Sequence, residues 1–240
     1  MKPEYIPTPR PARPSEPTPL DMAIYNFQLK AAEFHDKRNK AAPINESPAA
    51  RKERVQKRDR DMEHLLLEQR KIEAHAKIQR ALKNYQEDNL SKDPDELLDE
   101  AHHPTARLAK YLTANGEPKP TVFHEAHHII PGKGRFLQEE MLTVRLNLHT
   151  YGVGINDPKN GVWLANYLRN KQDDWATPDA PAHRQVHGYN YENWLYTNLG
   201  IGIIPEQIFL GRLRVMKRQL KDGSQPSQVT AKKDINWDGR

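Results

Sequence analysis

The chain has 240 residues, of which 36% are hydrophobic and 29% are charged, so it can bury one modest core in one or two domains. It contains no cysteine, which excludes a disulfide framework and thiolate metal sites, and no apolar run reaches the length of a membrane span or of a signal-peptide core. The net charge of +5 suits a polyanionic partner such as nucleic acid without indicating a fold.

Proline and charged residues dominate the first half of the chain. Residues 1 to about 20 carry repeated prolines, and such a segment stays extended, as a linker or as a docking tail for a carrier. A short helix is expected over 20–40. A long, highly charged helix is expected over 49–90, because its narrow apolar stripe suits packing on another surface or in a helical hairpin. A further helix opens at Asp93 and is expected to end near Leu112.

The second half has the pattern of a domain with both strands and helices. A β-prone run begins at Thr121, and turn-forming residues precede a second short apolar run. In chain order we expect a strand at 121–130, a helix at 136–149, a turn-rich loop at 151–161, a strand at 162–164 and helices at 179–199 and 205–221. The expected fold class is therefore α+β and mostly helical. The last twenty residues are polar and are expected to be loose.

Histidines are concentrated in this second half, where six of the eleven fall within residues 124–187. The phrase Glu-Ala-His-His occurs twice, at 100–103 and at 125–128. The first copy precedes a proline in an acidic helical context, whereas apolar β-branched residues flank the second. On a strand, His127 and His128 point to opposite faces, so one can bind a metal ion while the other acts on a water molecule. Either copy alone would also fit a pair of partly exposed histidines.

The second histidine signal is the segment His183-Arg184-Gln185-Val186-His187. Residues four apart on a helix share one face, with Cβ atoms roughly 5–6 Å apart, so both imidazoles can reach one ion. This spacing also arises by chance. Together, the two signals and the strand–turn–strand–helix pattern between them favour a metal-assisted hydrolase, and we interpret the chain as a nuclease.

Three stretches, residues 125–131, 156–164 and 183–190, resemble the AHH nucleases of the HNH, or His-Me finger, superfamily. Members of this family are common as toxin modules of bacterial polymorphic toxin systems, and the histidine spacings are also similar to those of the colicin DNases. The resemblance covers about residues 118–200 and implies a ββα-metal core. The chain then divides into a Pro-rich flexible or adaptor segment (1–48), a helical region (49–116), an AHH nuclease domain (117–222) and a flexible tail (223–240).

The resemblance implies a metal site made of three histidines. His127, His183 and His187 would hold one divalent cation and leave positions open for a phosphate oxygen and water. Imidazole ligands favour zinc or nickel, whereas related enzymes often use magnesium, so we expect zinc or magnesium without choosing between them.

The same resemblance implies three further functional residues. His128 would accept a proton from the attacking water, because an imidazole pKa lies near the working pH. Asn160 would orient His128 through a hydrogen bond. Glu125 would support the metal site from outside or position the scissile phosphate.

The expected activity is that of a metal-dependent endonuclease that hydrolyses DNA phosphodiester bonds with little sequence preference, since no base-reading module is visible. The resemblance further implies an antibacterial effector, made in the bacterial cytoplasm without a signal peptide and delivered by a contact-dependent or type VI secretion apparatus. It would act in the cytoplasm of the target cell. The N-terminal half would then serve loading onto a carrier or adaptor, a cognate immunity protein would protect the producer, and no membrane contact is expected.

Two alternatives stay open on the sequence alone. The same residues would serve a ribonuclease toxin. The histidines would also suit a structural zinc site in a non-catalytic nucleic-acid-binding or adaptor protein, with the long helix as its interaction surface. A closed site with four ligands and no open position would favour this last alternative.

Overall fold

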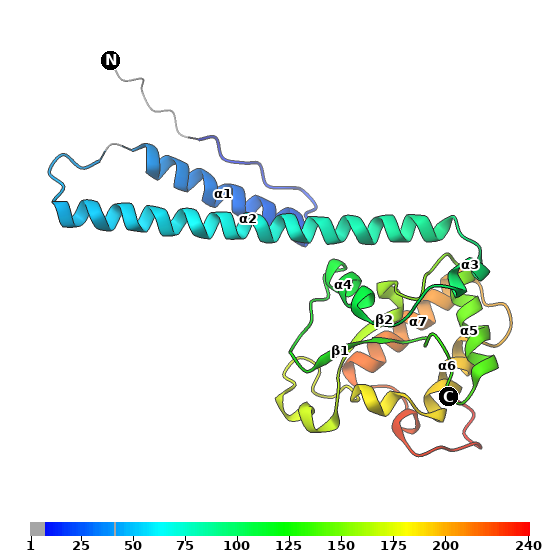
Figure 1. The fold of residues 1–240 in the computed structure, drawn as a ribbon. Helices are drawn as coiled ribbons and strands as arrows, with labels where there is room; N and C mark the ends of the chain where they lie inside the picture. The colour runs from blue at the N-terminus through cyan, green and yellow to red at the C-terminus, as the bar shows by residue number, and fades with distance from the viewer. Residues whose placement is uncertain (1–7, 41) are drawn as a thin grey trace. The chain divides into compact units, whose positions relative to one another are not determined.

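The computed structural model describes residues 8–40 and 42–240 (Figure 1). The start of the expected Pro-rich segment, residues 1–7, lies outside the described residues. The chain divides into two compact units, Met1–Ile78 and Gln79–Arg240. The described residues are mostly helical and include a two-stranded sheet, as the α+β expectation requires. None of the described helices is long and apolar enough to cross a membrane.

The first unit contains the two helices that the sequence predicts. Helix α1 spans Pro19–Asn39, and the Thr18 side chain caps its first turn in a reciprocal pair of hydrogen bonds with Asp21. Helix α2 spans Pro48–Leu90 and contributes residues to both units. Within the first unit, an ion pair of 2.6 Å joins Lys30 of α1 to Glu68 of α2. The described part of α1 buries no residue, so polar contacts and capping define this helix more than a core does.

The prediction of one helix from Asp93 onward is wrong. Two helices, α3 (Pro94–Leu98) and α4 (Ala106–Ala114), are separated by an irregular segment at 99–105. Pro104 explains the break, because proline disfavours the helical conformation of the residue before it and cannot donate a backbone hydrogen bond. The opening of α3 is as expected, with Asp93 as a side-chain cap.

The sheet pairs β1 (His124–His128) with β2 (Gly161–Ala165) in antiparallel register, with Ala126 opposite Trp163. Strand β1 lies within the run expected at 121–130, and β2 extends the run expected at 162–164 by one residue at each end. One face of the sheet packs against α4, where Leu108 joins Ala126 and Trp163 in a small apolar cluster. In Figure 1 the two strands lie between α4 and α7, and α4 contacts both of them.

The other face of the sheet belongs to the main core. Val162 and Leu164 of β2 pack there with residues of three helices. These helices are α5 (Gln138–Thr150), α6 (Tyr189–Leu199) and α7 (Glu206–Asp222). The C-terminal segment, which the sequence predicts to be a loose tail at 223–240, contacts this unit: Val229 is buried, and Asn190 of α6 donates to the backbone carbonyls of Gln228 and Lys232.

The prediction of a continuous helix over 179–199 is also wrong. A short 3-10 helix, His183–Val186, comes first, and α6 begins only at Tyr189 after Gly188. Neither His183 nor His187 therefore lies on an α-helix, and the i,i+4 argument does not explain how they meet. Further 3-10 turns occur at Pro158–Asn160, Leu168–Asp173 and Ser227–Thr230.

Candidate active site

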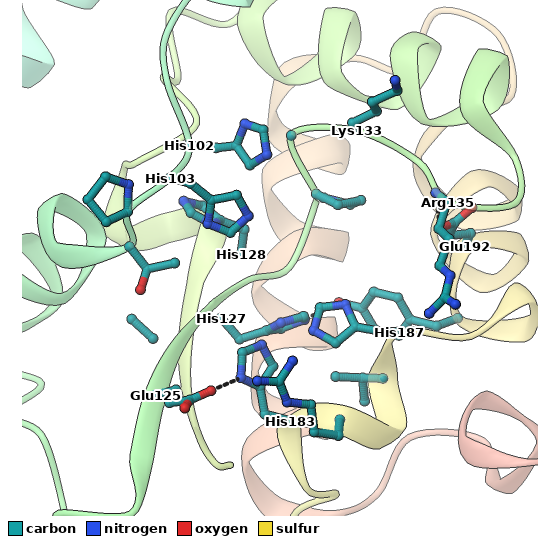
Figure 2. A pocket seen from close by; sticks show the side chains of 18 residues that line it. His102, His103, Glu125, His127, His128, Lys133, Arg135, His183, His187 and Glu192 are labelled. Carbon is teal, nitrogen blue, oxygen red and sulfur yellow. Dashed lines mark hydrogen bonds and ion pairs between the residues drawn. The ribbon is translucent and has the colours of Figure 1, made fainter. Parts of the chain in front are cut away.

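A pocket of about 650 Å³ opens beside β1 and collects histidines from three segments of the chain (Figure 2). It also includes cationic and acidic side chains from the loop after β1 and from α6. The histidines are His102, His103, His127, His128, His183 and His187. Six imidazoles around one pocket form a concentration of metal-binding and proton-accepting groups that a purely structural role would not require.

Strand geometry sends the two histidines of β1 to opposite faces, as the sequence predicts. His127 pairs with Val162, whose side chain is in the main core, and His128 shares its face with Ala126, which packs on α4. His127 is 3% exposed and His128 6% exposed, yet both line the pocket. The pocket thus spans the end of β1 and receives one imidazole from each face.

His127, His183 and His187 come together as a three-histidine group. Each offers one ring nitrogen, and these three atoms lie within 4.8 Å of one another. The ring centroids are 4.8–5.2 Å apart, with 4.8 Å between His183 and His187. The 3-10 helix His183–Val186, which His187 directly follows, brings these two histidines into range without an α-helical face. Three converging imidazoles match the donor set of a divalent-cation site with an open position.

Outer hydrogen bonds orient two of these imidazoles. The Tyr191 hydroxyl donates to the carbonyl of Ile129 at 2.7 Å, so it accepts from Nε2 of His127 at 3.0 Å. Nδ1 of His183 donates to the Glu125 carboxylate at 2.7 Å, the dashed line in Figure 2. The lone pair therefore lies on Nδ1 of His127 and on Nε2 of His183. Such partners fix ring orientation and tautomer at metal sites, so the residues fit a bound cation.

Burial favours the neutral form of all three imidazoles of the three-histidine group. Burial lowers the pKa of His127 well below its ordinary value, and the neighbouring imidazoles of His183 and His187 lower it further. Burial likewise lowers the pKa of His187 to about 4, with His183 and Arg184 adding to the effect. The pKa of His183 is lowered by burial although Glu125 opposes the shift. Neutral imidazoles have the lone pairs that a cation needs.

His128 occupies the other side of the pocket, and its hydrogen-bond partner differs from the predicted one. Nε2 of His128 lies 3.1 Å from Oδ1 of Asn156, not of Asn160. Asn160 instead accepts from the backbone N–H of Ile130 at 2.7 Å and donates to the carbonyls of Ile130 and Ile155. Its amide is thereby committed to backbone groups and fixes the end of β1 against the turn before β2. Burial lowers the pKa of His128 to about 4, against the opposing effect of Asn156.

The first Glu-Ala-His-His copy, at 100–103, reaches the same pocket. The rings of His102 and His103 lie 6.3 Å and 6.5 Å from the ring of His128, and Figure 2 shows them on its side of the pocket. Glu100 accepts a hydrogen bond from Nδ2 of Asn156 at 2.8 Å. The helical context that the sequence suggests for this copy is not observed, because the segment between α3 and α4 is irregular.

His124 has a structural position. It is fully buried, and its two ring nitrogens lie 2.9 Å from the Thr121 hydroxyl and 3.1 Å from the Thr177 hydroxyl. Asp174 completes this network at 3.5 Å. His124 therefore lies in a buried network and not among the residues that line the pocket.

Cationic side chains lie beside the three-histidine group. Arg135 and Arg184 line the pocket, and both add positive potential at His187. The Arg184 guanidinium is held 5.5 Å from the centre of the Tyr167 ring. The carboxylate of Glu192 accepts hydrogen bonds from the backbone N–H groups of residues 135–137. It is held by these bonds and is not free to form ion pairs with the two arginines. The pocket is therefore suited to an anionic group.

Several residues of the site were not predicted from the sequence to be functional, among them Glu100, Arg135, Asn156 and Tyr191. The repeated Glu-Ala-His-His phrase is a signal that could have identified Glu100. Tyr191 carries no local signal, because its partner His127 is 64 residues away in the chain. Asn156 and Asn160 lie in one turn-rich loop, and only their three-dimensional contacts distinguish them.

Three converging imidazoles and the separate imidazole of His128 face one pocket that is suited to an anionic group, an arrangement that fits nuclease chemistry. Comparison with protein families agrees: residues 108–200 match AHH, a nuclease family of the HNH/ENDO VII superfamily with conserved AHH. The motif itself is Ala126-His127-His128. The sequence-based recognition of this family is thereby confirmed for the matched segment. No curated protein and no solved structure matches the chain.

Proposed function

We propose that the protein is a metal-dependent endonuclease that hydrolyses DNA phosphodiester bonds with low sequence specificity. The observation that carries this proposal is the placement of His127, His183 and His187 within 4.8 Å of one another on one side of a pocket, with His128 on the other. The family match supports nuclease chemistry, and the net charge of +5 suits a polyanionic substrate. The arrangement also fits the ββα-metal core of the superfamily.

In this mechanism each residue has a separate task. His127, His183 and His187 would hold one divalent cation, zinc or magnesium, which stabilises charge on the phosphate and on the departing 3′ oxygen when bound. His128 is neutral at working pH and takes a proton from the attacking water. Glu125 orients His183 through the 2.7 Å hydrogen bond.

Other residues prepare the pocket for the substrate. Arg135 and Arg184 attract the phosphodiester to the side of the pocket where the three-histidine group lies. Asn160 contributes by holding the end of β1 through backbone contacts, so its role is positional and not through a hydrogen bond to His128. The pocket leaves space for a phosphate beside the histidines, which favours catalysis over a closed structural zinc site.

A cleavage assay tests the proposal. Purified protein is stripped with EDTA and incubated with supercoiled plasmid and with folded RNA, each with magnesium or zinc restored. We expect nicked and linear plasmid with metal and none with EDTA, and cutting slower by about 10²-fold or more with His128→Ala, which controls for a contaminating nuclease. Cleavage of RNA but not of plasmid would mean that the substrate is RNA and not DNA. Tight zinc binding without cleavage of either substrate would favour the non-catalytic zinc protein.

We also propose the biological setting that the family resemblance implies. The protein would be an antibacterial effector that acts in the target-cell cytoplasm, loaded onto a secretion carrier through its N-terminal half and neutralised in the producer by an immunity protein. Induced expression in the cytoplasm of a bacterium should stop growth and fragment the DNA, whereas the His128→Ala variant should not. Equal growth of both strains at equal protein levels would count against the toxin role.

A further inference from the structure

The first Glu-Ala-His-His copy contributes to the orientation of His128. The inference drawn from this contact rests on the proposed function of His128. The side chain of Asn156 lies between Glu100 and His128. Its Nδ2 donates to Oε1 of Glu100 at 2.8 Å and to the carbonyl of Ala101 at 3.0 Å, and its Oδ1 is 3.1 Å from Nε2 of His128. Carboxylate and carbonyl oxygens accept hydrogen bonds, so the amide is fixed with its oxygen toward the imidazole.

An amide oxygen facing Nε2 selects one tautomer of His128. The oxygen can only accept, so Nε2 must carry the proton, and Nδ1 then carries the lone pair. We propose that Glu100 is a positioning residue that, through Asn156, holds His128 with its proton on Nε2 and leaves Nδ1 to take the proton of the attacking water. As the water oxygen bonds to phosphorus and the bond to the departing 3′ oxygen breaks, that proton moves to Nδ1, and the departing oxygen takes a proton from solvent.

Glu100 is itself held by two further groups. The Tyr85 hydroxyl donates to Oε2 of Glu100 at 2.7 Å and accepts from the backbone N–H of Asn156 at 3.2 Å. Arg107 donates to Oε1 of Glu100 at 3.2 Å. The carboxylate is thus connected to both the backbone and the side chain of Asn156, which restricts rotation of the amide. An arrangement of this kind differs from a surface carboxylate that happens to lie within reach.

Three residues of this network, Tyr85, Glu100 and Arg107, precede the segment that matches the family. Tyr85 belongs to the C-terminal part of α2, and Glu100 follows α3, whereas the match begins at residue 108. Both residues belong to the second compact unit, which begins at Gln79. The catalytic unit therefore starts well before the family segment, and the first histidine copy is part of it.

Nuclear magnetic resonance of the full chain can test the proposed tautomer without any cleavage assay. In protein labelled with nitrogen-15 at histidine and freed of metal, the two ring nitrogens of a neutral imidazole give distinct signals for the protonated and unprotonated atom. The signals that disappear in His128→Ala identify His128. We expect a protonated Nε2 and an unprotonated Nδ1 in the wild-type protein. The opposite tautomer would overturn the proposal, and this result does not depend on whether a Glu100 variant folds.

Substitution of Glu100 then tests its own contribution. Glu100→Ala should populate the second tautomer of His128 and lower kcat by about 10- to 100-fold, while KM and zinc affinity stay unchanged. Glu100→Gln keeps an acceptor oxygen, so this variant should retain part of the wild-type tautomer preference and part of the wild-type kcat. The control Asp99→Asn removes a neighbouring exposed carboxylate that makes none of these contacts. A folded Glu100→Ala variant with unchanged tautomer and kcat would overturn the inference.

The two hypotheses fail in different ways. If neither DNA nor RNA is cleaved but His128 has the expected tautomer and loses it in Glu100→Ala, the proposed function fails and the positioning role stands. If the wild-type protein cleaves DNA and His128→Ala does not, but the tautomer is insensitive to Glu100→Ala, the function stands and the positioning role fails.

Discussion

The two Glu-Ala-His-His segments have the same four residues in the same order and use them differently. At 125–128 the backbone is a β-strand, so the glutamate and first histidine share one face while His128 points to the other. At 100–103 the backbone is irregular, and His102 and His103 lie with ring centroids 4.4 Å apart on one side of the pocket. The motif therefore acquires its chemical meaning from backbone geometry and not from its residue types.

The two glutamates show the same contrast. Glu125 accepts from His183 and supports the three-histidine group, whereas Glu100 accepts from Asn156 and acts on His128. One copy thus serves the proposed cation and the other the proposed proton acceptor. Experiments that change equivalent positions in the two copies should separate these roles.

The largest expected effect is at the second histidine of the strand copy. His128→Ala removes the proposed proton acceptor and should lower kcat for plasmid cleavage by about 10²- to 10⁴-fold. The control His64→Ala changes an exposed histidine of α2 and should leave kcat unchanged. A loss as large in His103→Ala, with little loss in His128→Ala, would assign the proton acceptor to the irregular copy instead.

The next effect is on metal binding. His183→Ala removes one of three converging nitrogens and should weaken zinc affinity by more than the roughly 10- to 100-fold typical of outer partners. Titration calorimetry with zinc on EDTA-treated protein measures it. His102→Ala removes an imidazole outside the three-histidine group and should leave zinc affinity unchanged. Equal zinc affinity in His183→Ala and in wild-type protein would contradict the assignment.

The two glutamates should separate in the same titration. Glu125→Gln weakens the hydrogen bond that orients His183, so zinc affinity should fall by about 10- to 100-fold. Glu100→Gln should not change it, because Glu100 contacts Asn156 and not a ligand of the group. Similar losses in both variants would mean that the two copies form one indivisible metal site.

Local patterns in the sequence predict much of the fold. The charged helix up to Leu90, the helix that begins near Pro205 and the two strands follow from periodicity and turn residues, and their observed bounds differ from the expected ones by a few residues. The sequence also places His127 and His128 on opposite faces, because a period of two is a property of any strand. The helix breaks at Pro104 and at Gly188 were missed, although both residues are helix-breaking types.

The missing part of the candidate site depends on contacts between distant residues. His128 and Asn156 are 28 positions apart, and Glu100 and Asn156 are 56 apart. Nothing in the local sequence states which asparagine of the turn-rich loop faces the imidazole and which binds the backbone. Such choices are set by how α3, the irregular segment and the loop pack, which no local pattern encodes.

A smaller effect is expected where the irregular copy is anchored. A Cβ added at Gly154 would lie 2.1 Å from the Tyr85 hydroxyl oxygen and 2.4 Å from Nδ2 of Asn89. Gly154→Ala should displace Tyr85 from Glu100 and lower the free energy of unfolding by about 1–3 kcal/mol. Gly211→Ala, in α7 with no atom within 4 Å of the new Cβ, should instead raise it by about 0.5–1 kcal/mol. Urea unfolding of both variants checks the difference, and equal stabilities would contradict the packing argument.

No effect on cleavage is expected at the other end of β1, where His124 shares one face of the strand with His128. His124 lies in the buried network with Thr177 and Asp174 and should matter for stability alone. Burial raises the pKa of Asp174, but hydrogen bonds from Lys171 and Thr177 outweigh it and lower the pKa to about 2.

Because the pKa of Asp174 in the folded protein lies below its ordinary value of 3.8, its carboxylate stabilises the fold above that pH and loses this effect as the pH falls toward about 2. Asp174→Asn should therefore lower the free energy of unfolding at neutral pH by about 1–3 kcal/mol, and the difference from wild-type protein should shrink in acid. Urea titrations across this range measure it. Since His128 and the three-histidine group do not contact Asp174, kcat and zinc affinity should stay at wild-type values in the folded variant. A loss of cleavage without a loss of stability would instead make the His124 end of the strand part of the active site.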